Sequence, residues 1–178
     1  MSVREIRLFG DPVLKSVGDP VVRFDDRLAA LVEDLVETTK IPGRAGVAAP
    51  QIGVSLRAFS YSVDGKVGYI INPVIEQLSG ETILVDEGCL SVPGLWHKTP
   101  RSEFAKVTGV DQDGKPISLE GTGLMAQMLQ HECDHLDGLL YVDRLKESWK
   151  EISSDIISDN GWGKPGLTWL PGKDNLEA

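Results

Sequence analysis

The chain has 178 residues, of which 41% are apolar and 25% are charged, and it carries a formal net charge of −9 at pH 7. This length suits one domain with its own hydrophobic core and is short for two. The acidic balance disfavours a nucleic-acid partner, because phosphate backbones are bound by basic surfaces. We therefore expect residues 1–178 to form one domain that makes no direct contact with nucleic acid.

Neither a secretory signal nor a membrane contact is expected. The N-terminal stretch MSVREIRLFGDPVLK contains no apolar core of the secretory kind. No window approaches the roughly 18 consecutive apolar residues of a spanning helix. The two cysteines, Cys89 and Cys133, are too few for a disulfide framework in a chain of this size. A reducing cytoplasm is therefore the expected compartment.

The first expected element is a helix over residues 24–40. Its apolar residues recur at the spacing of one helical face, and Asp25 or Asp26 is placed to cap its N-terminus. This apolar stripe consists of Leu28, Leu31, Val32, Leu35 and Val36. Residues 41–53, IPGRAGVAAPQIG, break the period with prolines and glycines, so we expect a loop or an irregular extended segment there.

Extended segments follow, and two Asp-Gly pairs predict hairpin turns between them. Asp64-Gly65 separates RAFSYSV from KVGYIIN, and Asp113-Gly114 separates FAKVTGVDQ from KPISL. A further extended run, ETILV, leads into DEGCLSVPG at residues 86–94. Short connections of this kind indicate antiparallel strand pairs.

Helical periodicity returns over residues 121–138, where Thr122 is placed to cap the start and Gly138 lies just past the end. Strands therefore precede one central helix, and a last helix follows it. This order indicates an α+β fold, in which antiparallel hairpins and sheets pack around the central helix and further helices lie near the N- and C-termini.

The last expected helix covers residues 146–157, with Trp149, Ile152 and Ile156 on one side. The tail at about residues 160–178 has too many glycines and prolines for a helix. Its large apolar residues, Trp162, Trp169 and Leu170, indicate that part of the tail packs against the core.

The central helix carries MLQHECDHLDG at residues 128–138, in which two of the three histidines lie four residues apart. Residues i and i+4 lie about 40° apart around a helix, so His131 and His135 project from one face and can bind one metal ion. Glu132 lies beside His131 and can reach a water on the metal without binding the metal. This arrangement of two ligands and a general base is typical of His-Glu-x-x-His sites.

The alternative interpretation is a polar helix face with a solvated Glu132. Leu124 and Met128 precede His131 by seven and three residues, which places the histidine face on the buried side of the helix. Two buried imidazoles without a shared ligand would be costly, so the pattern favours a metal site.

A catalytic site of this type needs a third protein ligand and one open position. Downstream candidates are Glu147 and Glu151, either of which would make the protein a zinc endopeptidase. The upstream candidate is Cys89, in the glycine- and proline-bounded segment EGCLSVPG. Cys133 lies about 200° around the helix from His131 and is expected to be a small packing residue. A degenerate, non-catalytic metal-binding module is a further alternative.

Three motifs together resemble the bacterial peptide deformylase family. They are GVAAPQ at residues 46–51, EGCLS at 87–91 and QHECDH at 130–135, in the family's order and at similar spacing. The flanking segments GDPVLK, DGKP and HLDGLLYVDRL are also similar, so the resemblance covers about residues 5–145. One departure is Arg44, where the family usually has the first glycine of this motif. Arginine adopts glycine-only dihedrals at a cost, so this loop is expected to differ in shape.

The resemblance implies hydrolysis of the N-formyl group from the N-terminal formyl-methionine of newly synthesised polypeptides, with release of formate. It implies that Cys89, His131 and His135 hold one divalent metal ion, with water in the fourth place. The family's metal is Fe²⁺, with Zn²⁺, Ni²⁺ and Co²⁺ as substitutes. The implied partners are N-formyl-methionyl nascent peptides and, as an open alternative, the ribosome exit region. We expect a monomer.

The resemblance also implies the catalytic roles. Glu132 would take a proton from the attacking water and deliver it to the leaving amine. The side-chain amide of Gln51 and the backbone N–H of Leu90 would stabilise the oxyanion together with the metal.

The methionine side chain of the substrate is expected to bind beside the central helix. Leu124 and Met128 repeat on the histidine face and lean toward the N-terminus of the helix, below the metal. Val85 would meet them from the strand before the metal ligand, and the loop at Ala45 and Gly46 would close the pocket. Core packing is the competing interpretation, above all for Leu124.

A supporting ion pair is expected between Glu87 and Arg101. Glu87 lies two residues before Cys89, so both side chains point to the same side of an extended strand. A buried carboxylate needs a cationic partner, and Arg101 is the nearest candidate in sequence and the one that the resemblance suggests. Trp96 and His97 flank the expected groove, and His97 is expected to be a surface residue.

Overall fold

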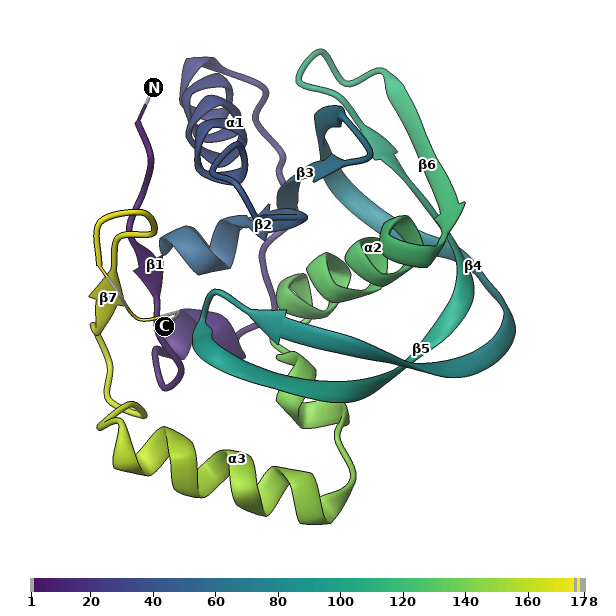
Figure 1. Cartoon of the computed structure of the whole chain (residues 1–178). Helices are drawn as coiled ribbons and strands as arrows, with labels where there is room; N and C mark the ends of the chain where they lie inside the picture. Colours follow the sequence, from purple (N-terminus) through teal and green to yellow (C-terminus); the bar gives the residue numbers. More distant parts are fainter. Residues whose placement is uncertain (1, 175, 177–178) are drawn as a thin grey trace.

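The computed structural model describes residues 2–174 and residue 176 and shows a curved antiparallel sheet around one central helix (Figure 1). The strands and helices are β1 (Ile6–Arg7), α1 (Asp26–Thr39), β2 (Gly46–Ala48), β3 (Ala58–Val63), β4 (Lys66–Cys89), β5 (Val92–Val110), β6 (Pro116–Thr122), α2 (Gly123–Leu136), α3 (Glu147–Asp159) and β7 (Thr168–Trp169). Short 3-10 helices are η1 (Pro12–Lys15), η2 (Ala49–Ile52) and η3 (Tyr141–Arg144). In the described part of the chain, no helix is long and apolar enough to cross a bilayer.

The main sheet has five strands in the order β2-β3-β4-β5-β6, and every neighbouring pair is antiparallel. Helix α2 packs on its inner face through Met128, Leu129 and Leu136, which share a core with Phe59 and Val107 of the sheet. Hairpins and sheets thus surround one central helix, as the α+β prediction required. Residues 1, 175 and 177–178 of the expected domain lie outside the described residues.

Helix α1 has the N-cap and the buried face that its sequence predicted. The Asp25 side chain accepts hydrogen bonds from the backbone N–H groups of Arg27 and Leu28, which satisfies two donors that the first turn leaves free. The buried stripe packs against the sheet through Leu28, Leu31, Val32 and Leu35, with Val36 partly buried beside them.

The first Asp-Gly turn is the tight hairpin that was predicted. Val63 pairs with Lys66, and Asp64 and Gly65 have φ values of +50° and +75°, as a two-residue type I′ turn requires. The second Asp-Gly pair lies in a longer loop, residues 111–115, in which the Asp111 side chain accepts hydrogen bonds from two backbone N–H groups.

Residues 41–53 are more regular than the sequence indicated. Gly46–Ala48 form the edge strand β2, paired with β3, and η2 follows directly with Pro50 in its first turn. The segment is too short for a period to show, and its pairing depends on the position of β3 rather than on its own composition. Strand β2 and helix η2 bring Gly46 and Gln51, respectively, to the site cavity.

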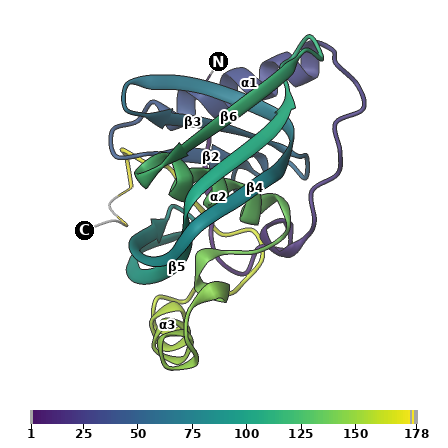
Figure 2. The ribbon, with the colours of Figure 1, turned by 90° about the vertical axis from the view of Figure 1, so that its right-hand side faces the viewer.

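Strands β4 and β5 form one long hairpin that curves around α2 (Figures 1 and 2). Their pairing is interrupted by register shifts, the last of them between Gly88 and Cys89. Such irregularities bend a strand and turn its side chains. The hairpin carries Cys89 close to its tip and returns along α2, which places the thiol opposite the face of the central helix.

Helix α2 begins and ends where the sequence predicted. Thr122 occupies the N-cap position, although its side chain makes no capping hydrogen bond, and Gly138 lies just beyond the last turn. Cys133 is buried in the core between α2 and the sheet, as expected of a packing residue.

The apolar residues predicted to share one side of α3 are not the ones that the helix buries most deeply. Trp149 and Ile152 are each 45% exposed and Ile156 is only partly buried, whereas Ser153 and Ile157 are the buried residues. Helix α3 lies on the outside of the molecule (Figure 1). It contacts the rest of the fold through Ile157, which belongs to a core cluster, and through the Ser153 hydroxyl, which lies 3.0 Å from a buried imidazole of β5.

The tail packs down at Trp169, as predicted from its aromatic residues. Strand β7 pairs with β1 so that Trp169 lies opposite Ile6, and the Trp169 side chain is buried in the core. Its indole N–H donates to the backbone carbonyl of Leu90 at 2.8 Å. Both ends of the chain therefore brace the segment that follows the cysteine. Trp162 and Leu170 are partly exposed.

Candidate metal centre

Three ligand atoms converge between α2 and the end of β4. They belong to Cys89, His131 and His135, and all lie within 4.8 Å of one another. The His135 Nε2 is 3.3 Å from the Cys89 Sγ and 3.2 Å from the His131 Nε2. A tetrahedral ion with bonds of about 2.0–2.3 Å holds its ligand atoms roughly 3.3–3.6 Å apart, so these donors fit a transition metal.

The two downstream carboxylates considered as third ligands are elsewhere. Glu147 and Glu151 lie at exposed positions of α3, on the outside of the fold. Within residues 2–174 and 176, the cysteine and the two histidines form the only group with metal-ligand geometry. The geometry therefore favours the upstream thiol over an endopeptidase arrangement.

The first histidine is oriented by a buried ion pair, and the pair predicted between Glu87 and Arg101 is present. The His131 Nδ1 donates to the Glu87 Oε1 at 2.6 Å. Arg101 clamps the same carboxylate with two hydrogen bonds, from Nε at 2.8 Å and from Nη2 at 2.5 Å. The proton on Nδ1 leaves the lone pair of Nε2 directed at the site.

The pKa of Glu87 reflects this environment. Burial alone would raise the pKa of Glu87, but the hydrogen bonds from Arg101 and His131 outweigh burial and lower it to about 2. The carboxylate is therefore ionised at any physiological pH. For His135, burial lowers the pKa well below its usual value, which keeps this ring neutral and able to bind a metal.

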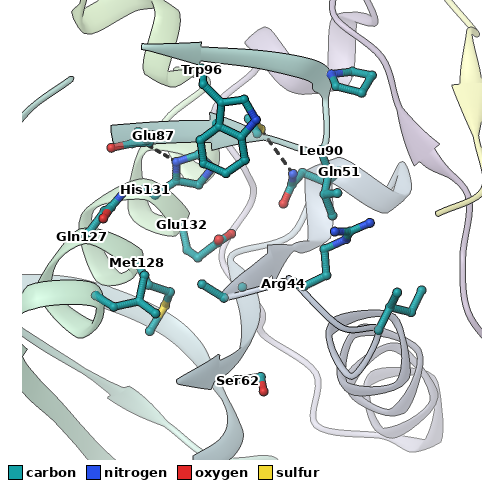
Figure 3. A pocket seen from close by; sticks show the side chains of 18 of the residues that line it. Arg44, Gln51, Ser62, Glu87, Leu90, Trp96, Gln127, Met128, His131 and Glu132 are labelled. Atoms are coloured by element: carbon teal, nitrogen blue, oxygen red, sulfur yellow. Dashed lines mark hydrogen bonds and ion pairs between the residues drawn. The ribbon is translucent and has the colours of Figure 1, made fainter. Parts of the chain in front are cut away.

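Glu132 lies beside the ligands and faces the cavity (Figure 3). The residue is only 2% exposed, and its Oε2 has no hydrogen-bond partner among the described residues. Burial raises the pKa of Glu132 to about 7, so this carboxyl can take up or release a proton near neutrality. An unpaired oxygen aimed into a polar site suits a group that works on a water molecule.

Gly46 permits the close approach of Glu132. A Cβ atom at position 46 would lie 2.4 Å from the Glu132 Oε1, far inside van der Waals contact. Strand β2 therefore needs glycine at this point, because the backbone passes directly against the carboxylate.

Gln51 points into the site with a fixed amide orientation. Its Oε1 accepts a hydrogen bond from the backbone N–H of Ala48 at 2.9 Å, which identifies the other end of the amide as the donor. That Nε2 lies 3.6 Å from the Cys89 Sγ and 3.5 Å from the Ser91 Oγ. The short helix η2 thus directs the NH₂ group of Gln51 toward the ligands.

A cavity of about 780 Å³ opens in front of these groups (Figure 3). Five of the residues that were expected to contact the substrate line this cavity: Ala45, Gly46, Leu90, Leu124 and Met128. Leu124 is 48% exposed, so simple core packing does not describe it, whereas Met128 is buried and belongs to both the cavity wall and the core.

Val85 was expected in this wall, and the structure places it elsewhere. Within the described part of the chain, Asp86, Glu87, Gly88 and Cys89 line the cavity and Val85 does not. Pairing with β5 is regular from Thr82 to Gly88, so alternation still places Val85 on the side of Glu87. An extended strand rises about 3.3 Å per residue, so Val85 lies roughly 13 Å along β4 from Cys89, beyond the end of the cavity.

Trp96, which was expected to flank the groove, is part of the cavity wall. It lines the cavity from β5, is 67% exposed, and lies opposite Gly88, where a Cβ would meet the indole ring at 2.8 Å. Gln127 of α2 also lines it and donates to the Asp86 carbonyl. Gln127 was not predicted, although it lies four residues before His131 on the same helix, and that spacing could have identified it.

The expectation that His97 lies at the surface is wrong. Its side chain points away from the cavity, is buried beneath α3, and lies 3.0 Å from the Ser153 Oγ through Nε2. Alternation along β5 puts Trp96 and His97 on opposite faces, and α3 covers the face that carries the histidine. The sequence could not show this cover, because it depends on where α3 docks.

Known proteins with the same organisation were found by both sequence and structure. The family model of polypeptide deformylase matches residues 3–151. A peptide deformylase of Parafrankia sp. (strain EAN1pec) is 48% identical over 96% of each chain. The crystal structure of a peptide deformylase from Legionella pneumophila superposes with a TM-score of 0.83 at 36% identity, covering 90% of this chain and 96% of that one.

The peptide deformylase from Thermus thermophilus superposes with a TM-score of 0.81 at 40% identity, covering 88% of this chain and 94% of its own. The family match includes the segments that carry the cysteine, both histidines and Glu132. The chain therefore belongs to the peptide deformylase family, the metal-dependent hydrolases that remove the N-formyl group from newly synthesised polypeptides.

Proposed function

We propose that the reaction takes place at one divalent metal ion held by Cys89, His131 and His135, with the remaining position facing the cavity. The observation that carries this proposal is the convergence of the three ligand atoms next to the unpaired oxygen of Glu132. When bound, the ion supplies Lewis-acid chemistry, which makes hydroxide available near neutral pH and polarises the formyl carbonyl.

Glu132 is the general base and acid of this proposal. It receives the proton of the attacking water and delivers that proton to the nitrogen of methionine, so that formate and a free amino terminus result. Its burial and its raised pKa support this role, because a carboxyl that titrates near neutrality can carry out both transfers. Gly46 leaves the space that the carboxylate occupies.

Gln51 and the backbone N–H of Leu90 stabilise the negative oxygen that develops on the formyl carbon. The hydrogen bond from Ala48 holds the amide oxygen of Gln51 away from the site, so the NH₂ group faces the developing charge. Because the NH₂ group is already oriented before the reaction, no free energy is spent on reorienting it as the charge develops. Leu90 is braced in turn by the indole of Trp169, which binds its carbonyl.

The methionine side chain of the substrate binds against α2. Leu124 and Met128 form the floor of this pocket, and Ala45 and Gly46 form the opposite side. Met128 adapts easily to a ligand, because its side chain is unbranched and polarisable. The remaining volume extends past Trp96 and accommodates the residues that follow methionine in the nascent chain.

For the metal we propose Fe²⁺, with Zn²⁺, Ni²⁺ and Co²⁺ as functional substitutes. A thiolate with two imidazoles suits several of these ions, so the ligand set alone does not select one metal among them. Both the thiolate and a ferrous ion are sensitive to oxidation, which supports a reducing cytoplasm as the compartment of the active enzyme. One chain supplies all the ligands together with Glu132 and Gln51, so a monomer suffices for activity.

The test combines metal analysis with a formate-release assay under reducing, oxygen-free conditions. We expect one metal per chain and release of formate from a formyl-methionyl tripeptide. The unformylated tripeptide serves as the control for the formyl group, and a longer blocked peptide tests cleavage of internal peptide bonds. Cleavage of the blocked peptide without formate release would contradict the proposal and support an endopeptidase.

A further inference from the structure

We propose that Arg144, at the surface, is a positioning residue that holds the first histidine of the metal centre through a chain of buried ion pairs. This inference rests on the proposed function, because it concerns support of the proposed metal ligand His131. No sequence pattern indicated it, since Arg144 lies in the connection after α2 and is not among the residues that line the cavity.

The outer part of this chain joins Arg144 to Asp134. Arg144 is the last residue of η3, and its Nε donates to the Asp134 Oδ2 at 2.5 Å while its Nη2 donates to the Oδ1. Such a two-pronged pair fixes the carboxylate plane as well as its charge. Asp134 belongs to α2 and is buried, three residues after the first histidine.

The inner part runs from Asp134 to the histidine. Arg101 donates from Nη1 to the Asp134 Oδ2 at 2.6 Å, and its other two nitrogens clamp Glu87. Glu87 in turn accepts the hydrogen bond from the ring of His131. All three guanidinium nitrogens of Arg101 are therefore engaged, and its orientation determines where both carboxylates lie.

The charges of this network balance only when Arg144 is included. Its carboxylates are Glu87 and Asp134, its cations are Arg101 and Arg144, and of the four only Arg144 reaches solvent, at 41% exposure of its side chain. Without Arg144, one buried guanidinium must neutralise two buried carboxylates, which is costly. Arg101 would then shift toward Asp134 and loosen its hold on Glu87.

A loosened Glu87 affects the metal ligand directly. The carboxylate partner of a ligating imidazole fixes the ring orientation and raises the basicity of the ligand, and loss of such partners typically costs about 10- to 100-fold in metal affinity. Arg144 acts three groups further out than Glu87, so we expect an effect of about 10-fold, at the lower end of that range.

The competing explanation is that Arg144 only fastens η3 to the rest of the fold. Lys15 provides a matched control, because it pairs with Asp143, the neighbour of Arg144 in the same short helix. The Lys15 side chain is 40% exposed, close to the value for Arg144. This pair also fastens η3, but its hydrogen bonds do not lead on to a histidine ring.

The experiment measures Co²⁺ binding to the metal-free protein by chelator competition, together with the visible absorption bands of the Co²⁺ complex. We expect Arg144→Ala to weaken Co²⁺ binding about 10-fold and to alter the bands. Arg144→Lys should recover part of the affinity, because lysine restores the charge without the two-pronged geometry. Lys15→Ala should leave affinity and bands unchanged and should lower the melting temperature less than Arg144→Ala, because its ion pair is exposed.

The results separate this inference from the proposed function. If the parent protein binds no Co²⁺ through its thiolate and imidazoles, the proposed metal site fails and the inference fails with it. If the parent protein binds Co²⁺ and Arg144→Ala matches Lys15→Ala in affinity and spectrum, the metal site stands and the inference is overturned.

Discussion

The two walls of the cavity are built in contrasting ways. The metal wall, formed by α2 and the end of β4, holds its side chains with buried ion pairs and hydrogen bonds, such as the Arg101 clamp on Glu87. The outer wall, formed by residues 40–46 and the hairpin tip at Trp96, has mostly exposed or half-buried residues. Its cation Lys40 pairs with Glu37 at the surface of α1.

This contrast assigns different tasks to the two walls. Buried charges must keep their partners, so the metal wall tolerates little displacement and fixes the reacting groups. Exposed ion pairs contribute about 0–1 kcal/mol, so the outer wall can adjust to different peptides. Changes in the metal wall should therefore reduce metal content or turnover, and changes in the outer wall should alter the apparent affinity for substrate.

The largest expected effect comes from Cys89→Ala. The variant loses the only thiolate among the three converging ligands, so we expect loss of bound metal and of formate release. Metal per chain is measured by elemental analysis after dialysis. Cys133→Ala is the control, because that thiol lies in the core behind α2, and this variant should keep its metal at a cost of about 1 kcal/mol in stability. Full metal occupancy in Cys89→Ala would show that the ligand is misassigned.

Glu132→Gln should separate chemistry from metal binding within the same wall. The amide is nearly isosteric with the carboxylate but takes up no proton, so turnover should fall by roughly 10²–10⁴ while one metal per chain remains. Both are measured on the same preparation. If the metal were lost together with activity, Glu132 would be a ligand and not the general base.

Gly46→Ala tests the point where the two walls meet. The added Cβ would lie 2.4 Å from the Glu132 Oε1, so the carboxylate must move. Misplacing a catalytic group by about 1 Å can cost roughly 10²-fold in rate, and we expect a loss of turnover approaching that size with the metal retained. Gly43→Ala is the control for a general disturbance of this segment, because its φ of +87° strains an alanine although nothing lies within 4 Å of a Cβ there. It should lower stability and keep turnover. Equal turnover in Gly46→Ala and the parent would show that the carboxylate needs no such space.

Some of the features on which these predictions depend could be predicted from the sequence, and others could not. The metal ligands on α2, the N-cap of α1 and the type I′ turn at Asp64-Gly65 follow from local spacing, so they could be predicted from the residues. Cys89 was one of several candidates until the family's motifs were recognised. The pair of Glu87 and Arg101 was predicted from alternation along a strand together with the cost of a buried charge.

Other features depend on contacts that no local pattern contains. Val85 lies outside the cavity because the cavity ends at Asp86, and His97 is buried because α3 covers it. The Ser153 hydroxyl of α3 contacts that buried imidazole, and the link from Asp134 to Arg144 closes only when η3 folds back. The extent of a cavity and the docking of helices are tertiary properties, which is why local alternation and periodicity could not predict these features.

Leu124→Trp tests the proposed methionine pocket beside α2. Leu124 is half-exposed in the cavity, so a larger ring fills the proposed methionine pocket without straining the core. We expect KM for formyl-methionyl peptides to rise about tenfold, which corresponds to roughly 1.4 kcal/mol, with metal content and melting temperature unchanged. Met128 is less suitable for this test, because it is buried and overpacking there would destabilise the fold. An unchanged KM would mean that the methionine side chain binds elsewhere.

Trp96→Ala should have the smallest effect, and one that depends on substrate length. The indole covers Gly88 and exposes its other side at the cavity, beyond the metal ligands, where residues after methionine would pass. A stacking surface of this kind contributes about 1 kcal/mol, so KM for a formyl-methionyl tripeptide should rise roughly fivefold. Formyl-methionine amide does not extend that far and should be hydrolysed as before.

Leu84→Ala is the control for Trp96→Ala, because it removes an exposed apolar side chain from the same hairpin outside the cavity wall. It should leave both substrates unaffected. The ratio of the two KM values is the decisive quantity, since a general disturbance of the hairpin would raise KM for the amide and the tripeptide alike. Equal changes in KM for both substrates would mean that Trp96 supports the metal wall and does not contact the residues after methionine. The contrast between the two walls would then not hold at Trp96.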